Sequence, residues 1–146
     1  MEICQIFSDK KRYLELLLLA DEEERMVERY LGRGALYVLG EPARALCVVT
    51  DEGGGVAELK NLAVAPQWQR QGLGRRMVEY VCARYSGGFH TLLVGTGDAP
   101  GTMAFYRKCG FSYSHKVDGF FTKNYSRPIV EDGVRLRDMV YFRRAL

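Results

Sequence analysis

The sequence predicts a single α/β domain built on a mixed, mostly antiparallel sheet of about seven strands, with about four helices packed on it. β-rich runs and helical patterns follow one another in the order β-αα-βββ-α-β-α-ββ, which excludes the all-α and all-β classes. The 146 residues are 47% hydrophobic and 27% charged, which is typical of a globular protein with one sizeable core. We therefore expect residues 1–146 to form one domain, and the disordered and fibrous classes are excluded.

The first half of the chain is expected to supply four strands and two helices. Asp21 followed by Glu24 is typical of a helix start, and Gly32 of a helix end. Glycine and proline at 40–42 predict a hairpin turn between the flanking runs. The expected elements are a strand over 3–7, a Leu-rich helix from Ser8 or Asp9 to Leu19, a helix from Asp21 to Gly32, and strands over 36–39, 45–49 and 56–65.

The second half is expected to supply two more helices and three strands. Leu73, Met77, Tyr80 and Val81 recur on one helical face, and residues 91–94 are fully apolar, as expected of a central strand. The expected elements are a helix over 73–85, a strand over 91–94, a short helix over 102–108 with Thr102 as its N-cap, a strand over 111–117, an irregular connection over 118–133, and a final strand over 134–143.

The most informative segment is Gln69-Arg70-Gln71-Gly72-Leu73-Gly74-Arg75-Arg76, at the junction of a strand and a helix. Two glycines in such a turn let backbone amides approach a ligand closely. The first turn of a helix favours Asp or Glu because the helix dipole is positive there, yet arginines stand at 70, 75 and 76. We interpret the segment as a site for a diphosphate. The alternative is a tight turn with solvated arginines.

Two common phosphate motifs do not fit this segment. A P-loop requires Gly-Lys-Ser/Thr, and a dinucleotide fingerprint requires a small residue where Met77 stands. The pattern Gln/Arg-x-x-Gly-x-Gly/Ala after a strand resembles the acetyl-CoA pyrophosphate loop of the GNAT superfamily of N-acetyltransferases. The run Ala104-Phe105-Tyr106-Arg107-Lys108-Cys109-Gly110-Phe111 is similar to the family's second signature, and the element order is the GNAT arrangement. The early Leu-Leu-Leu-Leu-Ala-Asp run at 16–21 and the tail with Phe120-Phe121, Tyr125, Pro128-Ile129 and Arg137-Asp138-Met139 resemble a small bacterial branch of YvbK type.

This resemblance implies a GNAT fold in which strands four and five splay apart and hold acetyl-CoA, the acetyl donor. The pantetheine arm would bond to the backbone of strand four, whose amides would also stabilise the oxyanion of the tetrahedral intermediate. Many relatives carry an Asn near the start of the helix after strand five, where this chain offers Asp98 or Thr102. The cofactor-binding residues implied are Leu62, Ala63, Val64, Arg70, Gln71, Gly72, Leu73, Gly74, Arg75 and Thr102.

Two residues match the family's catalytic positions. Tyr106 would donate a proton to the CoA thiolate, since a phenol with a pKa of about 10 stays protonated at neutral pH. The alternative for Tyr106 is packing. Glu58 matches a carboxylate that serves the amine's proton in some members. Strict strand alternation puts Glu58, Lys60, Leu62 and Val64 on one face, so a Glu58–Lys60 surface pair, or deprotonation through water, stays open.

We expect an enzyme that transfers acetyl directly to a primary amine. The long aromatic connection over 118–133 favours a closed pocket and hence a small molecule, with a protein amino group or a non-catalytic acyl-CoA sensor as the alternatives. Four scattered cysteines outside any Cys-His-acid setting argue against an acyl-enzyme, and two isolated histidines against a metal site. A net charge of +3 does not require nucleic acid, and no apolar run or leader indicates a membrane or export. We therefore expect a cytoplasmic protein, and a homodimer stays open.

Overall fold

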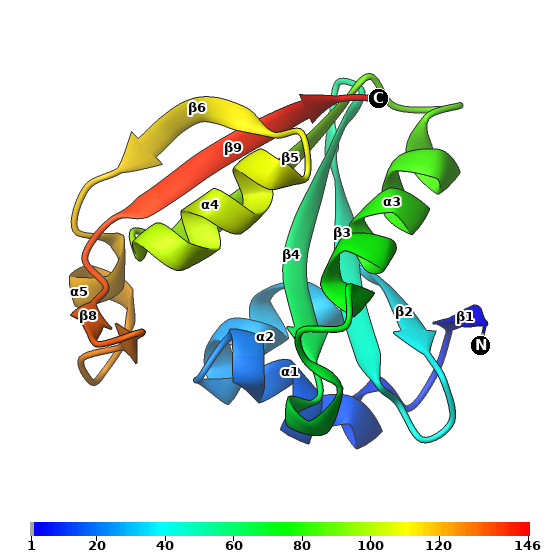
Figure 1. Cartoon of the computed structure of the whole chain (residues 1–146), viewed down its shortest axis with the longest axis horizontal. Helices are drawn as coiled ribbons and strands as arrows, with labels where there is room; N and C mark the ends of the chain where they lie inside the picture. Colours follow the sequence, from blue (N-terminus) through cyan, green and yellow to red (C-terminus); the bar gives the residue numbers. More distant parts are fainter. Residues whose placement is uncertain (1) are drawn as a thin grey trace.

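The computed structural model describes residues 2–146 and has a seven-stranded mixed sheet at its centre (Figure 1). The strand order is β1-β2-β3-β4-β5-β9-β6, and every pair is antiparallel except β4 with β5, which is parallel. The sheet strands are β1 (Ile3–Ile6), β2 (Ala35–Leu39), β3 (Ala45–Gly53), β4 (Val56–Val64), β5 (Thr91–Gly97), β6 (Ser112–Val117) and β9 (Met139–Ala145). The predicted fold class is confirmed.

Helices cover both faces of this sheet. The α-helices are α1 (Leu14–Ala20), α2 (Glu24–Leu31), α3 (Leu73–Tyr85), α4 (Pro100–Lys108) and α5 (Phe120–Asn124), and short 3-10 turns span Lys10–Tyr13 and Pro66–Trp68. One core lies between the sheet and α3 and α4, where Met77, Val81 and Phe142 are fully buried. A second core lies on the opposite face under α1 and α2, around Leu17 and Val27. The sheet is therefore the middle of three layers.

An extra residue in β4 changes which side chains face each core. In the pairing with β3, Val49 lies opposite Leu59 and Val48 opposite Asn61, so Lys60 is a β-bulge. Leu59 packs in the core under α3, and beyond the bulge Leu62 also packs there, while Asn61 turns to the α1 and α2 side. Strict alternation, which put Glu58 and Lys60 on the face of Leu62, is therefore wrong.

The bulge also marks the point where the sheet opens. β4 and β5 pair in parallel from Val56 opposite Thr91 to Leu59 opposite Val94, and no pairing continues beyond. β4 runs on to Val64 and β5 to Gly97, so these halves of the two strands diverge, as Figure 1 shows. Backbone groups on the β5 side of this part of β4 are not used in a ladder. The splaying of strands four and five is confirmed.

Four local predictions need correction. The final strand expected over 134–143 is divided into β8 (Val134–Arg135) and β9, which begins at Met139. Asp21 does not cap a helix: α2 begins at Glu24 after Glu23, which leaves the Asp21 carboxylate for other contacts. Thr102 is not an N-cap, because α4 begins at Pro100 and Thr102 lies within it.

The connection over 118–133 is not irregular, since it holds α5 and the first strand of a hairpin formed by β7 (Val130–Glu131) and β8 (Val134–Arg135). Apolar residues from this segment form a small third core around Phe121, Ile129 and Leu136. Burial of these side chains explains why an apparently loop-like sequence is structured. We call residues 118–136 the arm; α5 and β8 lie at one end of the molecule in Figure 1.

Candidate functional site

A cavity of about 930 Å³ lies where β4 and β5 part. It extends from the turn before α3, past β4, β5 and α4, to the corner between α1 and α2 and to the arm. Its lining residues are Leu19, Ala20, Asp21, Glu22, Leu59, Lys60, Asn61, Leu62, Val64, Gln69, Arg70, Gly72, Leu73, Gly74, Arg75, Val94, Gly95, Thr96, Gly97, Gly101, Thr102, Phe105, Tyr106, Phe121, Tyr125, Ile129, Val130, Glu131, Asp132, Leu136 and Met139. Elements that are distant in sequence thus line the same cavity.

The turn that precedes α3 presents free backbone amides at one end of this cavity. Gly72 is the N-cap and has φ +80°, a left-handed conformation that favours glycine. A Cβ on Gly72 would meet no protein atom within 4 Å, so the space above it is open. No side chain caps α3, and its first turn contains no acidic residue. Arg70 and Arg75 line the cavity here, so the turn combines amides, a helix dipole and cationic side chains, the ingredients of an anion site.

The second glycine of the turn has a packing role. A Cβ on Gly74 would lie 3.2 Å from Cζ of Phe105, so glycine lets α3 approach α4. The Gln69 side chain donates to the Val64 carbonyl oxygen at 3.0 Å and ties the turn to the end of β4. Gln71 belongs to the same turn and lies outside the set of lining residues. The anion site is thus held against the open half of β4.

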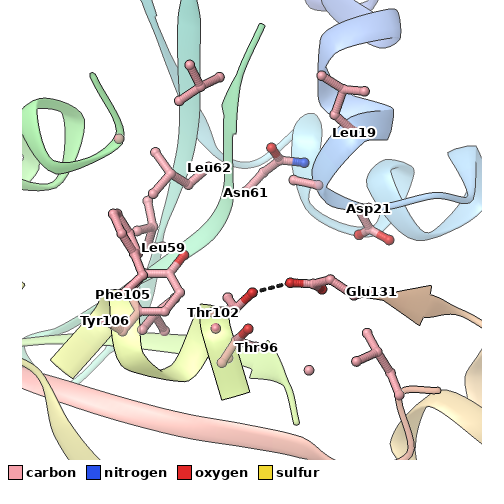
Figure 2. Close-up of a pocket in the computed structure, with 18 of the residues that line it drawn as sticks. Leu19, Asp21, Leu59, Asn61, Leu62, Thr96, Thr102, Phe105, Tyr106 and Glu131 are labelled. Carbon is pink, nitrogen blue, oxygen red and sulfur yellow. Dashed lines mark hydrogen bonds between the residues drawn. The ribbon is translucent and has the colours of Figure 1, made fainter. Parts of the chain in front are cut away.

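Along β4, Leu62 and Val64 line the cavity, whereas the Ala63 side chain is buried on the opposite face. Predicted contacts to this strand involve backbone groups, so the burial of Ala63 does not conflict with them. Backbone amides of Leu62 and its neighbours lie beside the open space because β5 no longer pairs with them. Figure 2 shows Leu59 and Leu62 on one side of the cavity.

Tyr106 reaches the cavity from α4. Its ring is 7% exposed and lies edge-on to Phe105 and Phe111, with ring centres 5.1 and 5.6 Å away. Its hydroxyl forms no hydrogen bond within residues 2–146 and points toward the cavity in Figure 2. Burial raises the pKa of Tyr106 well above its ordinary value, so the phenol stays protonated. It is a proton donor without a protein acceptor.

Thr102 lies one helical turn before Tyr106, and its hydroxyl donates to the Glu131 carboxylate on β7 (Figure 2). This contact joins α4 to the arm across the cavity. Asp98, the other polar substitute for the family's Asn, accepts a hydrogen bond from the Arg137 backbone N–H at 3.0 Å. Asp98 does not line the cavity, whereas Thr102 does.

Glu58 lies outside the cavity. The residue is 7% exposed, and its carboxylate forms an ion pair with Nζ of Lys60 at 3.1 Å. Burial raises the pKa of Glu58, and the nearby Lys60 ammonium opposes that rise. Because Glu58 stands on the face of β4 opposite Leu59, the structure does not bring it next to Tyr106. Its surroundings fit the ion-pair alternative.

The sequence reasoning missed a hydrogen-bonded chain at the other end of the cavity. Asn61 donates through Nδ2 to the Leu17 carbonyl oxygen at 3.0 Å and to the Tyr30 hydroxyl at 3.1 Å. The Tyr30 hydroxyl donates to Asp21 at 3.0 Å, and the Tyr125 hydroxyl donates to the other oxygen of Asp21 at 2.5 Å. An amide side chain directly before the apolar run of residues 62–65 was the signal available in the sequence.

Further bonds join the arm to the helices on this side. The backbone N–H and hydroxyl of Ser126 both donate to Glu23, at 2.9 and 2.8 Å, and Arg25 donates to the Asn124 carbonyl oxygen. With the Tyr125–Asp21 bond, they bridge the arm and the α1–α2 corner. That end of the cavity is therefore walled, whereas the turn before α3 is exposed.

The two ends of the cavity carry opposite charge. Arg70 and Arg75 lie at the turn before α3, whereas Asp21, Glu22, Glu131 and Asp132 line the walled end. No cluster of three or more His, Cys, Asp or Glu side chains within residues 2–146 could hold a metal ion. In the same residues, no helix is long and apolar enough to cross a membrane.

The cysteines do not supply a nucleophile at this cavity. None of the four is a lining residue, and all four are free thiols. Cys47 and Cys109 are buried; burial raises the pKa of Cys47 to about 12 and also raises the pKa of Cys109. A buried, protonated thiol is a poor nucleophile. The geometry therefore favours chemistry between two bound molecules.

Comparison with known proteins identifies the family. The acetyltransferase (GNAT) domain profile matches residues 15–113. The chain belongs to the GNAT acetyltransferase family. It is 32% identical over 130 residues to the N-acetyltransferase YvbK of Bacillus subtilis (strain 168), with 86% of this chain and 84% of YvbK covered. The GNAT resemblance drawn from the two sequence signatures is confirmed.

Solved structures of GNAT proteins match nearly the whole chain. A GNAT family acetyltransferase from Elizabethkingia anophelis with acetyl-CoA bound is 30% identical and superposes with a TM-score of 0.93, covering 99% of this chain and 97% of that one. A Bacillus subtilis acetyltransferase in complex with CoA is also 30% identical, with a TM-score of 0.90 and coverage of 99% and 98%. This GNAT chain therefore shares its fold with both structures over nearly their whole lengths.

Proposed function

We propose that this GNAT enzyme transfers the acetyl group of acetyl-CoA directly to a primary amine of a small molecule. One observation carries the proposal: a single cavity connects a basic, amide-rich turn, an unpaired tyrosine hydroxyl and a walled acidic end. Each part matches one need of the reaction, namely an anionic donor, a proton for the leaving group and a cationic amine.

Acetyl-CoA would lie between the open halves of β4 and β5. Its diphosphate would accept hydrogen bonds from amides of Gly72, Leu73 and Gly74, with Arg70 and Arg75 beside it. The pantetheine arm would bond to the unpaired backbone of Leu62 to Val64. The bound acetyl-CoA and CoA in the two structural relatives support this part of the proposal.

The reaction would proceed in one transfer without an acyl-enzyme. The neutral amine attacks the thioester carbonyl, an N–C bond forms, and the oxyanion is stabilised by a β4 amide near Leu62. The tetrahedral intermediate then collapses, the C–S bond breaks, and Tyr106 protonates the departing sulfur. The amine's excess protons leave to water, because Glu58 does not line the cavity. The phenoxide of Tyr106 is reprotonated from solvent.

The walled end favours a small acceptor over a peptide. An extended peptide needs an open groove, but Tyr125, Ser126 and Asn124 bond the arm to the α1–α2 corner. The acidic lining suits an amine that arrives as an ammonium ion. The alternatives are acetylation of a protein amino group and a non-catalytic acyl-CoA sensor, which retains the donor site without an acceptor.

A single screen tests this proposal. The purified protein is given acetyl-CoA with either small amines or amino-terminal peptides, and free thiol release is measured. We expect release with small amines. Release with peptides alone would refute the small-molecule acceptor, and silence with every acceptor despite CoA binding would favour the sensor. Calorimetry with CoA and with pantetheine, which lacks the phosphates, tests the donor site: equal binding, or none, would refute it.

A further inference from the structure

Asp21 is a carboxylate with no ion-pair partner in direct contact at the walled end of the cavity. Its carboxylate lines the cavity and accepts hydrogen bonds from the hydroxyls of Tyr30 and Tyr125, but it forms no ion pair within residues 2–146. Its neighbour Glu23, by contrast, pairs with Arg25. Burial raises the pKa of Asp21, and the hydrogen bonds from Tyr125 and Tyr30 and the positive charge of Arg29 oppose that rise.

The hydrogen bonds from Tyr30 and Tyr125 fix the orientation of the Asp21 carboxylate. Because Asn61 donates to the Tyr30 oxygen, the Tyr30 hydrogen is directed to Asp21. Tyr125 supplies a second donor from the arm. Two phenol donors stabilise the ionised carboxylate and leave its remaining lone pairs for another partner. Asn61 and Tyr30 thus act as positioning residues for Asp21.

A second observation on the same wall also indicates a missing donor. Asn61 is 3% exposed and lines the cavity, and its Oδ1 accepts no hydrogen bond within the described part of the chain. The amide cannot be turned around, because Nδ2 must donate to the Leu17 carbonyl oxygen. This wall therefore combines a carboxylate without an ion-pair partner and a buried acceptor without a donor. A charged N–H donor in the cavity would pair with the carboxylate.

From this arrangement we propose that Asp21 is the anchor for a second ammonium group of the acceptor, which makes the substrate class aliphatic diamines. One amine stays protonated at Asp21 while the other, neutral, faces the thioester beside Leu62 and Tyr106. Glu131 on the facing wall adds negative charge along the path between them (Figure 2). This inference rests on the proposed acetyltransferase function and specifies its acceptor.

The test compares diamines with alkylamines of equal length. Diamines with three to six methylenes are each paired with the alkylamine in which methyl replaces the distal ammonium, so only the charge differs. For the best diamine we expect kcat/KM at least about 30-fold above its alkylamine, the lower end of the effect of a buried charge pair. Asp21→Asn should lower kcat/KM for the diamine and leave kcat/KM for the alkylamine unchanged, so that their ratio falls to near one.

Two variants serve as controls. Glu15→Gln makes the same charge change on the exposed face of α1 and should preserve the ratio. Tyr125→Phe removes one donor to Asp21 while keeping the charge, so diamine preference should persist at a reduced level. If Asp21→Asn slows both amines equally and lowers the melting temperature, Asp21 only ties the arm to α1 and α2, and the proposal is wrong.

A binding experiment separates this inference from the proposed function. CoA-saturated protein is titrated calorimetrically with the same diamines. Diamine binding that Asp21→Asn abolishes, without any acetylation, would support the anchor and refute the acetyltransferase proposal. Acetylation of amines without a preference for diamines would support the acetyltransferase proposal and refute the anchor. Absence of both diamine binding and diamine acetylation would overturn the anchor.

Discussion

Replacing Gly72 by Asp or by Asn gives a matched test of the diphosphate site. Both side chains are similar in volume, and both tolerate the left-handed conformation that Gly72 adopts at φ +80°. Neither Cβ meets a protein atom within 4 Å, so the folded protein has room for either residue. The two variants therefore share their backbone strain and their steric effect on a ligand, and they differ only in charge.

The charge effect can be worked out from the geometry. A carboxylate at position 72 would lie about 5 Å from a diphosphate bound to the amides of the turn. With two phosphate charges and an effective dielectric constant of about 40, the repulsion is about 3 kcal/mol, or about 150-fold in Kd. The shared left-handed strain costs each variant about 1 kcal/mol of unfolding free energy, which lowers the melting temperature by about 3 °C.

Calorimetric titration with CoA measures the difference directly. Gly72→Asp should bind CoA about two orders of magnitude more weakly than Gly72→Asn, and the gap should narrow in about 1 M salt because the charges are screened. Matching melting temperatures show that the fold is unaffected by the choice of side chain. Equal affinities for the two variants at low salt would mean that no anion approaches Gly72, and the interpretation of the turn would fail.

Other substitutions separate the catalytic candidates. Tyr106→Phe should lower kcat by about 100-fold and leave CoA affinity unchanged, and an unchanged kcat would mean that Tyr106 is only structural. Because the pKa of Tyr106 is raised, the phenol keeps its proton, and wild-type kcat should show no decrease from its ionisation below about pH 10. Glu58→Gln should lower kcat by less than about 10-fold. A larger decrease in kcat, together with loss of the acidic limb of the pH–rate profile, would identify Glu58 as the general base. Since burial raises the folded pKa of Glu58, the folded state binds its proton more tightly than the unfolded state, so stability from this group falls as pH rises above about 4.5. Melting temperatures of Glu58→Gln relative to wild type should accordingly increase with pH above that value.

The sequence was most informative where chemistry depends on local pattern. The order of elements, the turn around Gly72 and the position of Tyr106 on its helix all follow from periodicity and short motifs, and the structure agrees with the first and brings the other two to one cavity. Local signals suffice here because a helix start and a strand-to-helix turn are determined by neighbouring residues.

The acidic end could not be predicted because its contacts are distant in sequence. Asp21 has a local pattern typical of a helix start, yet it bonds to Tyr30 on α2 and to Tyr125, more than a hundred residues away. The arm has no regular periodicity in sequence because Gly119, Pro128 and Gly133 interrupt its apolar residues, and only the packing of those residues around Phe121 and Leu136 gives it structure. Tertiary contacts thus override local propensity at both places.

The bulge at Lys60 lies where the sheet opens, and we expect it to be the cause of the opening. β4 leaves β5 directly after Leu59, and Lys60 is the next residue, so the local bend of the bulge accounts for the divergence. Deleting Lys60 would pair residues 59 and 61 regularly with Val49 and Val48, and every side chain beyond would keep its face. The deletion variant should therefore fold, with a straighter β4 and a narrower cavity.

We expect CoA affinity of the deletion variant to fall by about 100-fold or more, because the strand amides that would bind pantetheine are recruited into pairing with β5. Hydrogen exchange at the Gly95 to Gly97 amides should slow at the same time, which reports the new pairing. The variant Lys60→Ala keeps the bulge while it removes the ammonium, and it should bind CoA about as well as wild type. A deletion variant that folds and binds CoA normally would show that the bulge is not what opens β4 from β5.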